Sequence, residues 1–260
     1  MGRLLFICPS YGKFVYSRRA VASFLQHSPP DSFALVVDDC SPGFDQQNWA
    51  AWAHDLPRDR IQIYRFGRQD GLTRSWNHGL TYARSHGFTY AIAGNSDIIF
   101  TPGWWEPVRA GLAGGWHLLG PITNAPGRTN RQRQSVTRYL PGYVTSDDPA
   151  DLATVAAELQ SRHARTGIVS SKINGYCTVA RTDVWWAGAF NKQYVFDPKY
   201  KLTGNEDELQ TRWLTRRFRI GFVPSSFVFH YRAVSRGDKH KHTGWYRASS
   251  AEEPRQCPVP

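Results

Sequence analysis

Short apolar runs alternate with amphipathic segments through the first part of the chain. Four runs rich in β-branched and aromatic residues have the pattern of buried strands, and they cover residues 3–8, 33–39, 60–66 and 88–94. The segments between them repeat apolar residues three and four positions apart, as one helix face requires, over residues 17–27, 45–55 and 72–86. This alternation with short connections predicts an α/β fold with a mostly parallel sheet flanked by helices.

Polar residues stand where these predicted strands end. Ligands of parallel sheets bind beyond the carboxyl ends of the strands. Those ends are occupied by residues 9–11, Asp38 with Asp39, the loop 67–74, and residues 95–97. We therefore expect a binding site at this edge, although an acid such as Asp97 after a strand also fits a solvated turn.

The pattern changes after Ile122. Residues 123–134 are rich in Gly, Pro, Asn and Arg and predict an exposed loop. A helix is expected to follow Asp148 as its N-cap, with Pro149 at its first position. Further on, "NGYCTVAR" and "FVPSSFVFHYR" predict strands on either side of a helix in "NEDELQTRWLTRRF". The tail after Trp245 is expected to be poorly ordered unless it is pinned.

Composition narrows the class of protein. The chain has 260 residues, and its 41% hydrophobic and 14% aromatic content excludes a mainly disordered protein. No apolar run approaches the roughly 20 residues that cross a bilayer, and the amino-terminal apolar segment reads as a core strand rather than a signal peptide. The four cysteines have neither metal-ligand spacing nor the density of a disulfide framework, so a cytoplasmic location is expected.

Positive charge is concentrated in two segments. The formal net charge is +11, and residues 212–247 hold nine Lys or Arg against one acid, Asp238. A second run has no acid and consists of Arg128, Arg131, Arg133 and Arg138. Basic surfaces attract phosphates, so an anionic partner is expected, with general solubility as the alternative interpretation.

Several short motifs follow one another in an order that resembles glycosyltransferase family 2. They are "CPSYGK", "LVVDDCSPG", "GLTRSWNHGLTYA" and "NSDIIFTPGWW", and later "NGYCTVARTDVWW", "GNEDELQTRWL" and "VPSSFVFHYR". The resemblance covers about residues 3–232. It implies the family's Rossmann-like GT-A fold in a single compact domain, which agrees with the periodicity. The expected division is a nucleotide-sugar half (1–122), an acceptor-side insertion (123–171), a catalytic half (172–245) and a tail (246–260).

The resemblance also assigns residues to a nucleotide-sugar donor. Its implied donor contacts are Pro9 and Tyr11 at the nucleobase, Asp39 at uracil, Arg74 and Asn77 near the ribose and diphosphate, and Ser96. Two of these have simpler readings, because Tyr11 also fits a turn or core position and Arg74 also fits a solvated helix face. Two adjacent carboxylates that end an apolar strand, however, are costly without a ligand or hydrogen-bond partners.

A divalent cation is implied by the same resemblance. Asp97 matches the last acid of the family's DxD-type motif, which holds Mn²⁺ or Mg²⁺ against the diphosphate, and His230 matches a histidine that completes the metal shell. Both cations prefer oxygen ligands and share phosphate oxygens readily. The sequence departs from the pattern at Asn95, where the first acid often stands. The departure implies weak metal affinity or a lost donor site, and His230 alone on an apolar strand also fits a core position.

The catalytic candidates are Glu206 and Asp207. They begin a predicted helix, so compensation of the helix dipole is the simple interpretation. The family places its general base in this pair, and Asp207 matches it better. The implied reaction is in-line displacement with inversion at the anomeric carbon, in which Asp207 takes the proton of the acceptor hydroxyl. Asn174, Gly175 and Trp185–Trp186 are further candidates for sugar or acceptor contacts, although the two tryptophans fit core positions equally well.

Three hypotheses follow. The favoured one is an inverting, metal-dependent hexosyltransferase that uses a nucleotide sugar, with UDP expected, on an anionic acceptor; its specific version glycosylates hydroxymethylated bases of DNA, as bacteriophage enzymes do. The second is a non-catalytic sugar- or nucleic-acid-binding module on a decayed transferase scaffold, motivated by "NSD". The third, a nucleotidyltransferase, ranks below both because "CPSYGKFVYS" lacks a glycine-rich phosphate loop with Arg or Lys.

Overall fold

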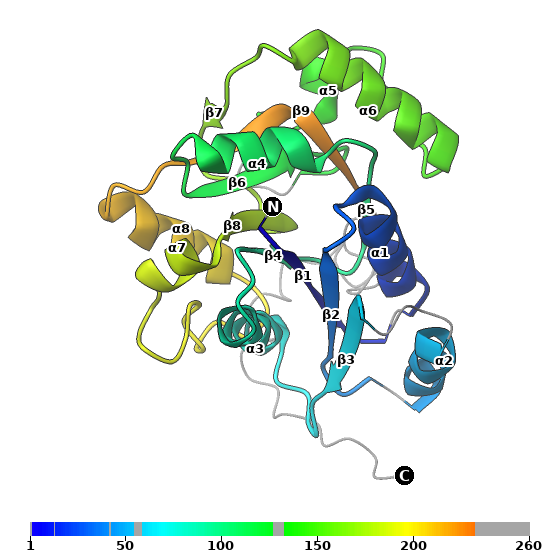
Figure 1. Ribbon diagram of the computed structural model, residues 1–260, viewed down its shortest axis with the longest axis vertical. Coiled ribbons are helices and arrows are strands. Elements are labelled where there is room, and N and C mark those ends of the chain that lie inside the picture. The colour runs from blue at the N-terminus through cyan, green and yellow to red at the C-terminus, as the bar shows by residue number, and fades with distance from the viewer. Residues whose placement is uncertain (1, 13, 42, 55–58, 127–132, 232–260) are drawn as a thin grey trace, which may run out of the picture.

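A computed structural model describes residues 2–12, 14–41, 43–54, 59–126 and 133–231 (Figure 1). The strands are β1 Leu4–Ser10, β2 Phe33–Asp38, β3 Ile61–Arg65, β4 Tyr90–Gly94, β5 Ile98–Phe100, β6 Leu118–Ile122, β7 Val169–Ser170, β8 Cys177–Arg181 and β9 Ile220–His230. The helices are α1 Phe14–His27, α2 Gly43–His54, α3 Leu72–Ser85, α4 Trp105–Ala113, α5 Val136–Tyr139, α6 Pro149–His163, α7 Thr182–Ala187 and α8 Asn205–Thr215. Arg128, Arg131, the basic segment beyond Tyr231 and the tail 246–260 lie outside the described residues.

The strands form one mixed sheet in the order β3-β2-β1-β4-β8-β6-β9-β5, with β7 paired to β9. Strands β1 to β4 are mutually parallel, β8 runs against β4 and β6, and β9 is parallel to β6. Strands β5 and β7 run against β9, so six of the nine strands share one direction. The predicted α/β fold with a mostly parallel sheet is confirmed.

Side-chain alternation divides the core into two layers. On β1, Leu5 and Ile7 belong to one buried cluster, and Leu4 and Phe6 belong to the other. The first cluster contains apolar residues of α3, α6, α7 and α8, and the second contains those of α1, α2 and α4. Helices therefore cover both faces of the sheet (Figure 1).

The predicted elements of the first half are confirmed, since their ends differ from the structure by at most three residues. The helix after Asp148 is also confirmed. The Asp148 carboxylate accepts hydrogen bonds from the backbone of Ala150 at 2.8 Å and of Asp151 at 3.3 Å, and Pro149 is the first residue of α6. These carboxylate bonds satisfy N–H groups that lack a partner within the helix.

The prediction of an exposed loop over residues 123–134 is wrong at its described ends. Thr123 and Gln134 are fully buried. The Gln134 amide donates to the carbonyl of Pro121 at 2.7 Å, and its oxygen accepts from the backbone and side chain of Asn174 at 2.9 and 3.0 Å. A polar side chain is buried here because each of its groups has a partner.

An aromatic cluster joins the helices of the second half. Phe196 contacts Trp76 of α3 with ring centres 5.1 Å apart and Trp185 of α7 at 5.7 Å, and Trp185 contacts Trp213 of α8 at 5.3 Å. All of these side chains are at most 2% exposed. Trp185 is therefore a core residue and not an acceptor contact, and the cluster fixes α8 relative to α3.

No helix in the described part of the chain is long and apolar enough to cross a membrane. Cys8 and Cys177 are free thiols in the core. Burial raises the pKa of both, and the Asp97 carboxylate raises that of Cys8 further, so neither is activated as a nucleophile.

Candidate functional site

The carboxyl ends of β1 and β2 hold the first part of the site. The backbone N–H of Asp39 donates to the carbonyl of Ser10 at 2.8 Å, which joins the two strand ends. Both oxygens of the buried Asp39 carboxylate accept backbone N–H bonds, from Asp70 at 2.9 Å and from Gly71 at 2.8 Å. Asp39 thus supports the loop before α3 and keeps lone pairs for another donor.

Burial raises the pKa of Asp39 to about 6, even though the two backbone N–H donors and Arg74 act to lower it. Its neighbour Asp38 is also buried and lies 3.5 Å from the guanidinium of Arg65. The adjacent carboxylates therefore have different partners, as alternation along a strand dictates. The base contact at Asp39 stays a prediction.

Arg74 stands in the first turn of α3 with its guanidinium carbon 3.9 Å from the centre of the Phe66 ring. Its nearest acid is Asp70, 3.6 Å from Nη1. That Nη1 atom is buried and has no hydrogen-bond partner among the described residues. A buried donor without a partner is rare and costly in a native protein, so this nitrogen is suited to an anionic ligand.

Asn77 is placed in the same helix and is 5% exposed. Its oxygen accepts from the backbone of Val195 at 3.0 Å and of Phe196 at 2.9 Å, and its amide donates to the Phe196 carbonyl at 2.9 Å. The amide therefore holds the 195–196 segment, a structural role that the sequence analysis missed. Its predicted contact with the donor stays a prediction.

Glycine is required at position 71. Its φ is +94°, and a Cβ atom there would lie 2.7 Å from the carbonyl oxygen of Lys201. The same segment also meets Thr73, whose backbone N–H donates to that carbonyl at 3.1 Å and whose hydroxyl accepts from Asn205 at 2.7 Å. The start of α8 is thereby held against the start of α3.

Asp97 and His230 face each other at the end of β9. The Nε2 atom of His230 lies 3.3 Å from an Asp97 carboxylate oxygen, and both side chains are less than 10% exposed. His230 Nδ1 lies 3.1 Å from the carbonyl of Ala125. A carbonyl only accepts, so Nδ1 donates to it, and in the neutral imidazole the Nε2 lone pair points toward Asp97 and the Asn95 amide, which is 3.3 Å away.

This pair fits a divalent cation. One carboxylate oxygen and one imidazole lone pair converge, and the other ring nitrogen is fixed by a carbonyl, as in metal-bound histidines. Stacking of Tyr176 on the imidazole, with ring centres 5.1 Å apart, adds a second constraint. The described part of the chain holds no cluster of three or more His, Cys, Asp or Glu that could bind a metal. A cation that shares phosphate oxygens needs few protein ligands.

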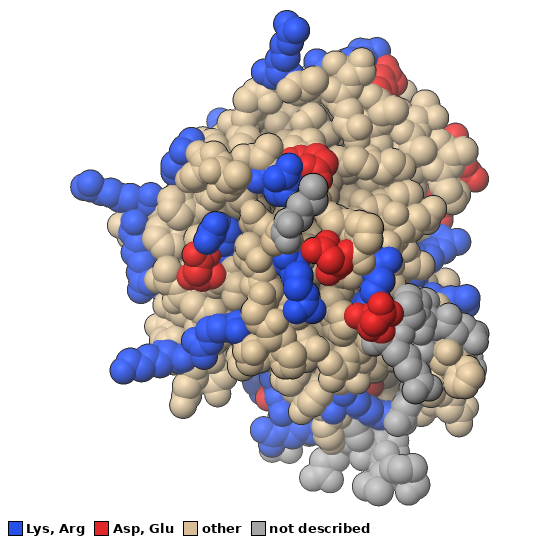
Figure 2. Space-filling view, in the orientation of Figure 1, with Lys and Arg blue, Asp and Glu red and all other residues tan. Residues whose placement is uncertain are grey.

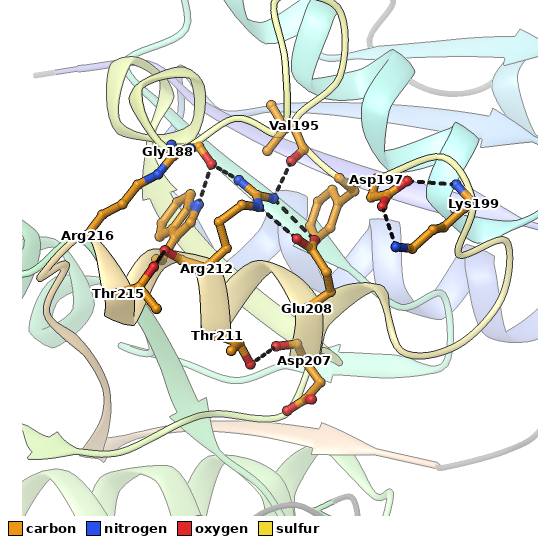
Figure 3. Close-up of polar contacts among 12 residues, drawn as sticks. Gly188, Val195, Asp197, Lys199, Asp207, Glu208, Thr211, Arg212, Thr215 and Arg216 are labelled. Carbon is orange, nitrogen blue, oxygen red and sulfur yellow. Dashed lines mark hydrogen bonds and ion pairs between the residues drawn. The ribbon is translucent and has the colours of Figure 1, made fainter.

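Three consecutive acids begin α8 and differ in their surroundings (Figure 3). Glu208 accepts from Arg212 at 2.8 Å, and Arg212 also donates to the backbone carbonyls of Gly188 and Val195. Asp207 leaves the helix on the opposite side (Figure 3) and is 58% exposed. Glu208 is thus committed to structure, whereas Asp207 is accessible to a substrate.

Lys172 is a site residue that the sequence analysis missed. Its ammonium lies 2.8 Å from the Asp207 carboxylate and donates to Thr211 at 2.7 Å, one turn further along α8. Gly175 follows closely in sequence, and a Cβ atom there would lie 2.9 Å from Glu206. The segment 172–175 therefore packs directly on the first turn of α8, and no spacing rule links it to that turn.

The other predicted donor contacts line the same edge of the sheet. Pro9 is buried in β1, Tyr11 follows it with 37% exposure, and Ser96 is half-buried beside Asp97. The ends of β1, β2, β4 and β9 point the same way. The predicted site residues other than the α8 acids therefore lie at strand ends or in the adjoining first two turns of α3.

The family model that matches this chain is described as Glycosyl transferase family 2, and it matches residues 6–157, more than half of the sequence. The chain belongs to this family. Its motifs at Asp39, Arg74 and Asp97 lie inside the matched region, whereas His230 and the α8 acids lie beyond it. A comparison with curated proteins finds no match.

Solved structures share the fold. A crystal structure of GalNAc-T7 with UDP, GalNAc and Mn²⁺ has a TM-score of 0.66 and 14% identity, covering 88% of this chain and 44% of that one. The crystal structure of S. aureus TarS 1–349 has a TM-score of 0.56 and 14% identity, and the match covers 88% of this chain and 60% of that one. The mannosyltransferase PcManGT from Pyrobaculum calidifontis, in complex with GDP-Man and Mn²⁺, has a TM-score of 0.61 and 12% identity. That match covers 98% of this chain and 66% of that one. The chain thus spans less than two thirds of each of these proteins and has the GT-A fold that they represent.

Proposed function

We propose that the chain is an inverting, metal-dependent glycosyltransferase that moves a hexose from a nucleoside diphosphate donor, UDP in the first instance, to an acceptor hydroxyl. The observation that carries the proposal is the pair Asp97 and His230, 3.3 Å apart, with the imidazole lone pair turned toward the carboxylate. Family membership supports it, as do the ligands named for two similar structures, UDP, GalNAc and Mn²⁺ for one and GDP-Man and Mn²⁺ for the other.

The donor site is proposed along the carboxyl edge. The half-exposed Tyr11 offers a ring face to the base, and the Asp39 carboxylate offers an acceptor to a ring N–H. Arg74 directs Nη1, which makes no hydrogen bond to the described residues, toward the diphosphate, where a guanidinium offsets negative charge and donates hydrogen bonds. Pro9, Ser96 and Asn77 complete the wall as predicted from the motifs.

Asp97 and His230 would hold Mn²⁺ or Mg²⁺ there. When bound, the cation supplies positive charge against the leaving diphosphate. The protein's own part is the Ala125 carbonyl, which accepts a hydrogen bond from Nδ1–H of His230 and so leaves Nε2 as the lone-pair donor. Departure of the diphosphate is further favoured by Arg74, since its charge is already placed before the reaction.

Asp207 is proposed as the general base. It takes the proton of the acceptor hydroxyl while that oxygen attacks the anomeric carbon on the face opposite the leaving group, which inverts the configuration. Lys172 holds the carboxylate in one position, and the exposed side of Asp207 leaves room for the acceptor. Glu206 packs against Gly175 and shapes the approach.

The acceptor is proposed to be anionic, because basic residues lie in the insertion, residues 123–171. Arg133 and Arg138 are exposed in the described part of that segment. DNA with hydroxymethylated bases and an acidic carbohydrate both carry the negative charge that these arginines attract. Transfer of labelled sugar to modified DNA, to a neutral glycan and to an acidic glycan distinguishes these acceptors.

A non-catalytic binding module is the second candidate. The Asn95 amide donates toward His230 Nε2 at 3.3 Å, so the position of the missing acid is occupied by a group that fills the metal-binding lone pair. The choice between the candidates depends on whether a cation displaces this amide.

Both candidates are tested by thermal unfolding with a panel of UDP- and GDP-sugars, with and without Mn²⁺, and by hydrolysis of the donor. At a hundredfold excess over Kd a donor stabilises by about 2.7 kcal/mol, a shift of a few degrees. We expect a metal-dependent shift that Asp97→Ala abolishes and that Asp183→Ala, an exposed acid on α7, retains. A shift without hydrolysis would favour the binding module, and no shift with any donor would overturn the proposal.

A further inference from the structure

A cavity of about 550 Å³, broadly open to solvent, lies away from the candidate site, where α3 ends. It is lined by Arg84, Trp186, Ala189, Asn191 and Lys192. Arg84 follows Arg74 on α3, and a rise of 1.5 Å per residue places them about 15 Å apart along the helix axis. The cavity therefore belongs to a different edge of the molecule from the donor site.

The free polar groups that line this cavity are hydrogen-bond donors. Asn191 has its oxygen engaged by the backbone N–H groups of Gln193 at 2.8 Å and Tyr194 at 2.9 Å, which leaves its NH₂ group. Over the described ranges of the chain, the guanidinium of Arg84 and the ammonium of Lys192 have no hydrogen-bond or ion-pair partner in the protein. A lining of unpaired donors is complementary to a ligand rich in acceptors.

The cavity is also positive. It has no carboxylate in its lining, and two acids of neighbouring elements are engaged, Asp183 by Arg181 at 2.9 Å and Glu208 by Arg212 at 2.8 Å. Arg216 adds a further cation, because its guanidinium donates to the carbonyl at the end of α7 at 3.3 Å. Figure 2 shows Lys and Arg side chains gathered along the left border of the molecule, over α7, α8 and the turn into β9.

The walls of the cavity are preformed. The indole N–H of Trp186 donates to the Leu80 carbonyl at 3.2 Å, and the Arg84 guanidinium carbon lies 3.6 Å from the centre of the ring. The segment that carries Asn191 and Lys192 is held at its end by Asn77 and Arg212, which bind the backbone of Val195. Little conformational entropy is therefore lost when a ligand binds.

The chemistry of the ligand follows from these contacts. Arg and Lys recognise carboxylates and phosphates, and a cavity of this size accommodates one or two sugar rings. The one aromatic residue in the lining, Trp186, packs against the core and carries Arg84, so the lining itself offers no free ring on which a base could stack. The lining thus favours an anionic sugar over a base.

We propose that this cavity binds an anionic group, a carboxylate or a phosphate, on a carbohydrate acceptor at a distance from the hydroxyl that is glycosylated. The acceptor role rests on the proposed function, whereas binding itself requires neither donor nor metal. A polymer bound both at this cavity and at the catalytic site would dissociate more slowly than one bound at the catalytic site alone. Binding at one site raises the effective concentration of the polymer at the other site.

Calorimetric titration of the full chain, without donor or metal, tests the proposal. The probes are an oligogalacturonate, which carries carboxylates, an oligomeric glycerol phosphate, a neutral maltooligosaccharide and single-stranded DNA of equal charge. The test variant is the double change Arg84→Gln and Lys192→Gln. The control double change, Arg109→Gln and Arg162→Gln, removes the same charge from exposed residues that pair with Glu106 and Glu158.

We expect one or both acidic oligosaccharides to bind, with affinity reduced at least tenfold in the test variant and less than twofold in the control. The probe that binds more tightly identifies carboxylate or phosphate as the preferred group. Equal losses in the two doubles, binding of DNA above both glycans, or no binding of either glycan would overturn the proposal. Donor hydrolysis is measured in parallel for the wild type, the test variant and the control. If none of the three hydrolyses a donor, the proposed function is refuted, and the binding result still decides the role of this cavity.

Discussion

The phenol of Tyr231 donates a hydrogen bond to the carboxylate of Asp147 at 2.7 Å and so anchors the residue that follows β9. Arg19 of α1 lies 2.7 Å from the same carboxylate, and the backbone N–H of Tyr231 donates to the carbonyl of Asp97 at 2.9 Å. Burial and the hydrogen bond to Asp147 raise the pKa of Tyr231 to about 12, so the phenol stays a donor at neutral pH. The contact fixes His230, the preceding residue, against Asp97.

Tyr231→Phe should therefore weaken Mn²⁺ binding about tenfold, as loss of a group that orients a metal ligand commonly does. At saturating Mn²⁺ the rate of donor hydrolysis should change less than twofold, because the phenol touches no reacting atom. Metal affinity is measured by the electron paramagnetic resonance of free Mn²⁺. Tyr16→Phe is the matched control, since the Tyr16 ring contacts that of Tyr231 at 4.8 Å; an equal loss in both variants would refute the orienting role.

Asn95→Asp should strengthen metal binding. The Asn95 amide lies 3.3 Å from His230 Nε2, so a carboxylate at this position would add a charged oxygen ligand and end the competition for the imidazole lone pair. We expect Mn²⁺ affinity to rise about tenfold, and the metal-free protein to lose about 1 kcal/mol because two carboxylates then repel each other. The control is Asn48→Asp, which makes the same change on α2. Asn124→Asp is not used, because the Asn124 side chain accepts a hydrogen bond from the backbone of His230. Unchanged Mn²⁺ affinity in Asn95→Asp would place the cation elsewhere.

Asp207→Asn should lower kcat by a factor of about 10² to 10⁴ and leave donor affinity unchanged, as expected when a general base is removed. Its melting temperature should stay within about 2 °C of the wild type, because an exposed ion pair contributes little to stability. Glu208→Gln should do the reverse, destabilising the fold by about 1–2 kcal/mol through its part-buried pair with Arg212 and sparing most of kcat. Reversed effects in the two variants would move the base assignment to Glu208.

The sequence predicts well what local pattern determines. Strand and helix periodicities in the first half, and the N-cap at Asp148, depend on neighbouring residues and match the structure. The position of the site also follows from local signals, because the carboxyl ends of parallel strands meet at one edge.

Side chains that bridge distant segments are not predicted. Asn77 binds the backbone of residues 195 and 196, Gln134 binds Asn174, and Lys172 binds Asp207. Each is a polar side chain whose role depends on a partner many residues away, and no periodicity records that partner. For the same reason Gln134 resembled a loop residue, although it is fully buried.

Asp39 gives the structure a defined dependence on pH. Its pKa is raised from 3.8 to about 6, chiefly by burial, so folding favours the neutral carboxyl. This group therefore contributes stability that is fully present below its ordinary pKa and is lost as the pH rises through about 6. Linkage puts that loss at about 2 kcal/mol between about pH 4.5 and pH 7.5.

Asp39→Asn removes the titration but not the burial. The variant should be less stable at every pH, because the amide has one acceptor oxygen where the carboxylate has two. Of the backbone N–H groups of Asp70 and Gly71, one keeps its acceptor and the other faces an NH₂ group, which is also a donor. The test is the difference in free energy of unfolding between wild type and variant, measured in urea across this range, which cancels the other titrating groups. That difference should shrink by about 2 kcal/mol as the pH rises. A constant difference would mean that the donors from the loop offset burial completely, and that Asp39 is ionised throughout and ready to accept from a base at any of these pH values.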